Sequence, residues 1–84
     1  MTEADWRWGL TELKMLKGNQ IIVPAKKQLQ VTFGAGNTGV TYIEDKDKAH
    51  IERGFLVHRC FGQGHSPYLV YVDLDKIISM QLSL

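Results

Sequence analysis

Residues 67–84, PYLVYVDLDKIISMQLSL, constrain the fold of this chain more than any other segment. They begin with an apolar run at 68–72. After a polar step at 73–76 they continue with Ile78, Met80, Leu82 and Leu84 at alternate positions. Alternation with period two is typical of a strand that turns one apolar face to a core. Because such a short step can join antiparallel neighbours, the sequence predicts a sheet in which these last two strands pair.

The length and composition predict one small domain over residues 1–84 with a limited core. A chain of this length buries roughly 60–65% of the surface that its unfolded form exposes. The single cysteine, Cys60, excludes an internal disulfide and the usual closed zinc ribbons and fingers. Association with other copies is the remaining common way to stabilise a domain of this size. We therefore expect a homo-oligomer, with a dimer as the simplest form.

The charge and hydropathy patterns indicate neither a strong nucleic-acid surface nor a membrane segment. Ten basic and nine acidic residues are spread along the chain and leave a formal net charge of +1. This balance gives no strong field for nucleic acid or an anionic membrane. No stretch reaches the roughly 20 apolar residues of a membrane span, and the first residues do not resemble an export signal. We expect a cytoplasmic protein without a cofactor.

The N-terminal segment predicts an amphipathic helix over residues 3–17. Thr2 and Asp5 have the spacing of a helix N-cap with an acidic first turn, and Trp6, Leu10 and Leu13 follow at helical intervals. The Gly-Asn pair at 18–19 would end this helix. An alternative stays open, in which 13–17 pairs with 20–23 as a hairpin across a type II′ loop at 18–19.

Five or six short strands are expected after the helix. The sequence predicts a short strand at 20–23 and a hairpin of strands 29–33 and 40–44. A solvated turn at 44–48, a long strand at 51–61 that bends at Gly54 and the two C-terminal strands follow. No segment predicts the crossover helix that a parallel sheet needs. The expected fold class is mainly β (α+β), with an antiparallel, strongly curved sheet or small open barrel.

Residues 72–80 resemble the closing strand pair of Sm-like and SH3-like small barrels. A helix ahead of five strands is also the order of Sm-like proteins. The chain has Asp73 and Leu74 where the Sm-like family commonly has a polar residue and a glycine. The resemblance implies a barrel-like shape and assigns no functional residue.

Gly34, Gly36 and Gly39 spell G-x-G-x-x-G directly after a predicted strand, which is the position of a dinucleotide-binding fingerprint. That site needs a helix immediately after the loop, so that backbone N–H groups and the helix dipole face the pyrophosphate. The residues that follow, Val-Thr-Tyr-Ile at 40–43, favour a strand. We therefore interpret 34–39 as a hairpin loop, with anion binding by its N–H groups left open.

The side chains that could support metal or thiol chemistry are His50, His58, Cys60 and His65. On a strand, His58 and Cys60 would point the same way about 7 Å apart. One such pair without a second close pair is a weak zinc pattern. Parallel side chains are also poorly placed for a cysteine nucleophile and its base. We interpret Cys60 as a small buried apolar residue and His58 as a partly buried neighbour with a backbone hydrogen bond.

The aromatic residues suggest binding. We expect Trp6 to pack the helix onto the sheet and to leave Trp8 outside, where exposed indoles favour protein interfaces. The candidate binding residues are Trp8, Tyr42, His58, His65 and Tyr68. Because 51–61 and 68–72 carry apolar residues on both faces, our first hypothesis is a non-enzymatic interaction module that self-associates and binds another protein or a small ligand. The alternatives are a small nucleic-acid-binding barrel that stacks bases on Tyr or Trp, and a thiol- or metal-dependent enzyme using Cys60 and His58.

Overall fold

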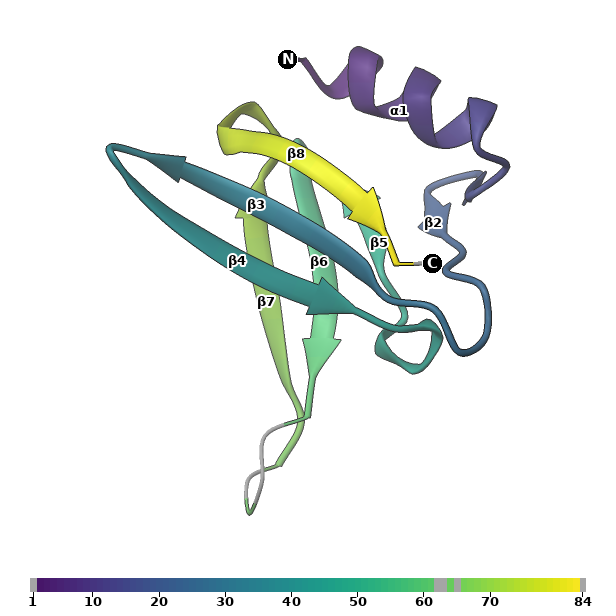
Figure 1. Cartoon of the computed structure of the whole chain (residues 1–84), viewed down its shortest axis with the longest axis vertical. Coiled ribbons are helices and arrows are strands. Elements are labelled where there is room, and N and C mark those ends of the chain that lie inside the picture. Colours follow the sequence, from purple (N-terminus) through teal and green to yellow (C-terminus); the bar gives the residue numbers. More distant parts are fainter. Residues whose placement is uncertain (1, 62–63, 65, 84) are drawn as a thin grey trace.

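The computed structural model describes residues 2–61, 64 and 66–83, which form one N-terminal helix and eight strands in two antiparallel sheets (Figure 1). The larger sheet has the strand order β1-β2-β5-β6-β7 and the smaller one the order β4-β3-β8. This confirms the mainly β fold with a leading helix. Within these residues neither sheet closes into a barrel. The one helix described is too short and too polar to cross a membrane.

The elements follow one another with short connections. In chain order they are α1 (Glu3–Glu12), β1 (Leu16–Lys17), β2 (Gln20–Ile21), β3 (Leu29–Ala35), β4 (Asn37–Ile43), η1 (Asp45–Asp47), β5 (His50–Glu52), β6 (Phe55–Cys60), β7 (Tyr68–Asp73), η2 (Leu74–Lys76) and β8 (Ile77–Leu82). Figure 1 shows the two sheets as crossing layers, with α1 at one end of the molecule.

The core lies between the two sheets and beneath α1. The side chains at its centre are Leu29 and Val31 of β3, Ile43 of β4, Ile51 of β5 and Leu56 of β6, all at most 2% exposed. Trp6 and Leu10 of α1 close one end, and the indole N–H of Trp6 donates to the carbonyl oxygen of Leu74 over 3.2 Å. The prediction that Trp6 attaches the helix to the sheet is confirmed.

The helix begins as predicted at Thr2 but ends at Glu12, so the predicted extension to residue 17 is wrong. Lys14 takes a left-handed conformation with φ +59°. The N–H groups of Lys14 and Met15 donate back to the carbonyl oxygens of Thr11 and Leu10, the pattern of a Schellman motif. Leu16–Lys17 then pairs with Gln20–Ile21. The chain therefore forms both a shorter helix and a shorter version of the alternative hairpin in succession.

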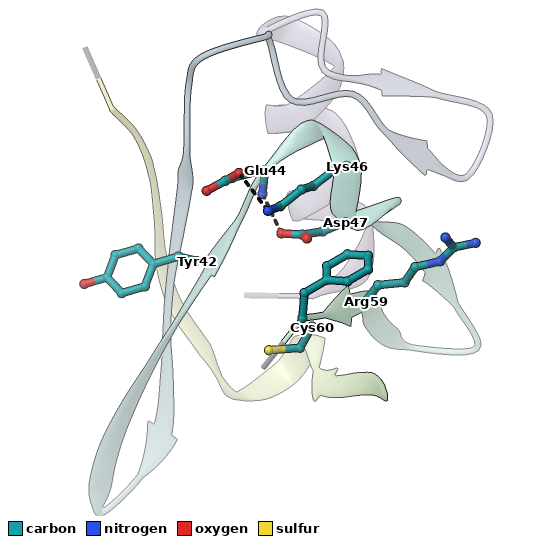
Figure 2. Close-up of a pocket in the computed structure, with 7 residues that line it drawn as sticks. Tyr42, Glu44, Lys46, Asp47, Arg59 and Cys60 are labelled. Carbon is teal, nitrogen blue, oxygen red and sulfur yellow. Dashed lines mark hydrogen bonds and ion pairs between the residues drawn. The ribbon is translucent and has the colours of Figure 1, made fainter. Parts of the chain in front are cut away.

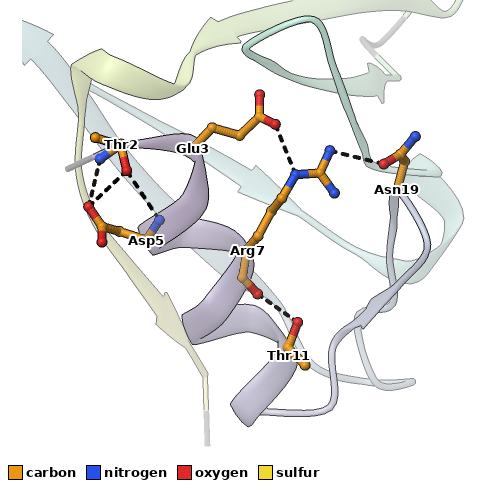
Figure 3. A network of polar contacts seen from close by, with 6 residues as sticks. All are labelled: Thr2, Glu3, Asp5, Arg7, Thr11 and Asn19. Carbon is orange, nitrogen blue, oxygen red and sulfur yellow. Dashed lines mark hydrogen bonds and ion pairs between the residues drawn. The ribbon is translucent and has the colours of Figure 1, made fainter.

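A network of polar contacts holds α1 in place (Figure 3). Thr2 and Asp5 form a capping box, in which the N–H of Asp5 donates to the Thr2 hydroxyl and the N–H of Thr2 to the Asp5 carboxylate. These bonds from Thr2 lower the pKa of Asp5 below its ordinary value. Arg7 donates to Glu3 within the helix and to the Asn19 side chain, both over 2.9 Å. Arg7 thus connects the helix to the β1–β2 turn.

Residues 51–61 form two strands, so the predicted single bent strand is wrong. Arg53 and Gly54 both have positive φ, +49° and +84°, as in a type I′ turn. The chain therefore reverses, and β5 and β6 pair with Glu52 opposite Phe55.

The last two strands lie in different sheets, so their predicted pairing is also wrong. β7 pairs with β6 and β8 with β3. The step between them is the short helix η2, whose Leu74 is 1% exposed and serves as the corner of the core. The predicted alternation fails at Ile78. A register shift opposite Thr32 and Phe33 leaves Ile78 55% exposed while Ile77 is buried.

The predicted hairpin at the glycine-rich segment is confirmed, but the predicted six-residue loop at 34–39 is wrong, because all of it except Gly36 belongs to the two strands. β3 and β4 pair from Leu29 opposite Ile43 to Ala35 opposite Asn37, so the strands extend to the tip at Gly36. No helix follows the glycines, and the dinucleotide geometry is not formed.

Candidate functional site

The side of β5, β6 and β7 that faces away from the core carries several exposed apolar side chains, and the strand register gives their layout. We call this side the outer face. The register places His50, Val57 and Tyr71 side by side on it, with Phe55 in the next row. Phe55, Leu69 and Tyr71 are 39%, 55% and 54% exposed. Val57 at the centre is only 1% exposed.

This surface arises because β6 and β7 carry apolar residues at successive positions. Leu56 and Val72 turn inward and are buried, so their neighbours must turn outward. The rings of Phe55 and Tyr71 meet edge to face, with centroids 6.0 Å apart and planes at 78°. Fully burying a side chain of this kind contributes about 1.5–3 kcal/mol. Much of that free energy is not realised in one copy of the chain.

A second candidate is a small polar cavity of about 170 Å³ at the end of β6 (Figure 2). Its lining residues are Tyr42, Glu44, Lys46, Asp47, Arg59, Cys60 and Phe61. The Lys46 ammonium lies 3.8 Å from the Glu44 carboxylate and 5.5 Å from the centre of the Phe61 ring. Asp47 is 6% exposed and accepts the N–H of Glu44, although the sequence predicted a solvated turn here. Two cations and two carboxylates leave the cavity without a net charge.

His58 connects the two sheets and is 1% exposed. Its Nδ1 lies 2.8 Å from the carbonyl oxygen of Arg59, and its Nε2 lies 3.0 Å from the Thr41 hydroxyl. A carbonyl oxygen only accepts, so Nδ1 donates, and in the neutral ring Nε2 accepts from Thr41. The predicted backbone hydrogen bond is confirmed, and both nitrogens are occupied by structural partners.

Cys60 and Tyr68 lie opposite each other on β6 and β7. Cys60 is half-buried at the end of β6, so the prediction that it is buried is wrong, and Tyr68 is 52% exposed. The pKa of the Tyr68 hydroxyl is raised above its ordinary value, first by a hydrogen-bonding interaction with Cys60 and second by the charge of the ionised thiol. The Tyr68 hydroxyl therefore keeps its proton to a higher pH than a free tyrosine. In the described part of the chain, no group of three or more His, Cys, Asp or Glu side chains is placed to hold a metal ion.

The structure does not bring the predicted binding residues into one site. Trp8 is 70% exposed on α1, Tyr42 belongs to the cavity wall, and His58 is buried. Tyr68 lies beside Cys60, and His65 lies outside the described residues.

The sequence analysis noted apolar residues on both faces of 51–61 and 68–72, but it did not name Phe55, Leu69 or Tyr71 as binding residues. Assigning which residues share a side needed the reversal at Gly54. The comparisons with known proteins do not supply a function, because no family model, no curated protein and no solved structure matches the chain.

Proposed function

We propose that this chain is a small, non-enzymatic interaction module that self-associates through the outer face. The observation that carries the proposal is the cluster of Phe55, Leu69 and Tyr71, three large apolar side chains exposed side by side on two paired strands. Contiguous exposed apolar surface on a small protein marks an interaction site. Burying it against a second copy adds to a core that one short chain cannot enlarge.

We also propose that the two sheets are the halves of a small open barrel of the Sm-like or SH3-like kind. The pairing of β8 with β3 supports this proposal, because it brings the last strand beside the first long one. The short helix η2 between β7 and β8 supports it as well, because it redirects the chain from one sheet to the other.

Sedimentation velocity is expected to show a monomer of 9.5 kDa giving way to a dimer as the protein concentration rises from about 5 to about 500 µM. We expect Tyr71→Thr to remain monomeric across this range, because it removes the exposed ring that lies beside Val57 in the central row of the outer face. Tyr42→Thr is the matched control. It removes a tyrosine of similar exposure, 52% against 54%, from the other sheet, and it should associate like the unchanged protein.

The possible results test two points separately: whether the chain self-associates, and whether it does so through the outer face. A chain that stays monomeric at every concentration would end the proposal of self-association. A dimer that Tyr42→Thr disrupts and Tyr71→Thr leaves intact would keep self-association and move it to the other sheet.

Nucleic-acid binding is the alternative function, and one observation favours it: Tyr42 and Phe61 line the same cavity as Lys46 and Arg59. Aromatic rings beside cations are the combination that holds single strands. The two carboxylates in the same wall oppose it. We therefore expect a labelled single-stranded oligonucleotide to show no rise in fluorescence anisotropy at low salt. A rise that disappears as salt is added would replace our proposal.

A further inference from the structure

The outer face has its charges at opposite ends of an apolar centre. At one end, the register places Glu52 and Asp73 on either side of Phe55. At the other end, Arg59 lies opposite Leu69, four residues along β6 from Phe55 and therefore about 13 Å away. Arg53 occupies the turn at the acidic end and is not a paired position of the face.

Glu52 and Arg59 are both exposed and free to meet a partner. Within residues 2–61, 64 and 66–83, neither side chain makes a hydrogen bond or ion pair with another side chain. In Figure 2 the guanidinium of Arg59 points away from Glu44 and Lys46. Asp73 is partly engaged, since its carboxylate accepts the N–H of Asp75 at the start of η2. Glu52 is therefore the acidic group that can be changed without disturbing a cap.

Two-fold symmetry allows this face to stack on itself in two ways. If the axis runs along the strands, equal ends meet, and Arg59 of one copy lies over Arg59 of the other. If the axis runs across the strands, opposite ends meet, and each Arg59 lies over the row of Glu52, Phe55 and Asp73. Like charges placed together oppose association, whereas opposite charges favour it and set the register. A guanidinium over the Phe55 ring adds a cation–π contact.

We propose that the partner of the outer face is a second copy of this chain, stacked face to face about a two-fold axis that runs across the strands. Arg59 of each copy then lies against the partner's Glu52 and Asp73, with Leu69 beside it, while Tyr71 lies in the central row next to Val57. This inference rests on the proposed self-association and adds the orientation of the two copies and the residues that select it. Stacked sheets lie about 10 Å apart with strands inclined by about 30°, a spacing that an arginine side chain can bridge.

The size of the face indicates that the charges decide whether the dimer forms. The face consists of β6 and β7 with six residues each and β5 with three. At about 4.8 Å between strands and about 3.4 Å per residue, it covers less than roughly 14 by 20 Å. A stable interface buries about 800 Å² on each side. The apolar contact alone is therefore small, and a weak, reversible dimer follows. Its dissociation constant should respond strongly to a reversed charge and should rise with salt.

Charge reversal and mixing test the orientation. Arg59→Glu places a carboxylate against two carboxylates at both ends of the dimer, so its dissociation constant should rise at least about tenfold. Glu52→Arg places cations together and should also weaken the dimer. An equimolar mixture of the two variants should recover the dimer. In the heterodimer the carboxylate introduced in one variant meets the guanidinium introduced in the other at one end, and the original contacts remain at the other end. Sedimentation equilibrium measures all three samples.

Two controls show whether a weaker dimer results from the changed contact rather than from net charge or misfolding. Lys26→Glu, in the exposed loop before β3, changes the net charge as much as Arg59→Glu and should leave the dimer unaffected. Circular dichroism should show the same fold for every variant. If the mixture of the two variants does not recover the dimer, the inference is wrong. It is also wrong if Arg59→Glu and the unchanged chain form a heterodimer whose dissociation constant is lower than that of either homodimer. Both results leave self-association standing, whereas a monomeric unchanged chain ends both proposals.

Discussion

Leu74→Ala is expected to lower the free energy of unfolding by about 3 kcal/mol, within the range of about 2–5 kcal/mol found for buried leucines. Leu74 is 1% exposed at the corner between the two sheets, so alanine leaves a cavity in the core. The carbonyl that receives the Trp6 N–H belongs to the backbone and is kept in the variant. The decrease in the free energy of unfolding therefore comes from the Leu74 side chain and not from the hydrogen bond. The total free energy of unfolding of a chain of this length is only about 4–12 kcal/mol.

Urea unfolding of the chain at low micromolar concentration measures the change. Leu13→Ala is the matched control, because it removes the same atoms from a side chain that is 66% exposed at the end of α1. We expect it to change the free energy of unfolding by less than about 0.5 kcal/mol. Equal losses for the two variants would show that Leu74 does not hold the corner.

Gly34→Ala is expected to lower the free energy of unfolding by at least about 2 kcal/mol. Both the backbone conformation and the lack of space at this position exclude a side chain. The φ of Gly34 is +147°, and a Cβ there would lie 2.0 Å from the carbonyl oxygen of Asn37. That oxygen belongs to the backbone of the paired strand, so no rotation of a side chain relieves the contact. The tip of the β3–β4 hairpin must move instead.

Gly36→Ala separates the two causes. Gly36 has φ +102°, but a Cβ added there would meet no atom within 4 Å, so alanine adds backbone strain without a clash. We expect its loss in urea unfolding to be clearly smaller than that of Gly34→Ala. Amide exchange of β3 and β4 should also quicken more in Gly34→Ala. The reverse order of losses would contradict the close approach of Gly34 to Asn37.

Local patterns predicted the elements better than their pairing. The cap at Thr2, the burial of Trp6 and the hairpin at the glycines follow from contacts between residues close in sequence or from a strong periodicity. The end of the helix does not, because Lys14 takes the left-handed conformation that favours glycine. The left-handed conformation of Lys14 accompanies the burial of Met15 and the pairing of Leu16–Lys17. The sequence around Lys14 does not predict either contact.

The errors in the C-terminal half have the same origin. Arg53 and Gly54 can continue a strand or reverse it, and the choice depends on which strand lies next to β5. Because 73–76 are mostly polar, the sequence did not predict that Leu74 is buried. Its burial depends on both sheets and on α1. The outer face could be located only after these reversals assigned inward and outward positions. Two-sided apolar strands alone did not show which side remains open.

The extra residue at position 78 has a consequence for how this chain can vary in length. One residue added to or removed from an ordinary strand exchanges its two sides, which places core residues in water. Opposite Thr32 and Phe33, β8 already accommodates one unpaired residue, Ile78, between Ile77 and Ser79. Shortening the chain by that residue restores a regular ladder and leaves Ile77, Met80 and Leu82 facing inward. We therefore expect position 78 to be the point in the last strand where a one-codon deletion keeps the inward residues inward, which amide exchange of β3 and β8 in that variant would check.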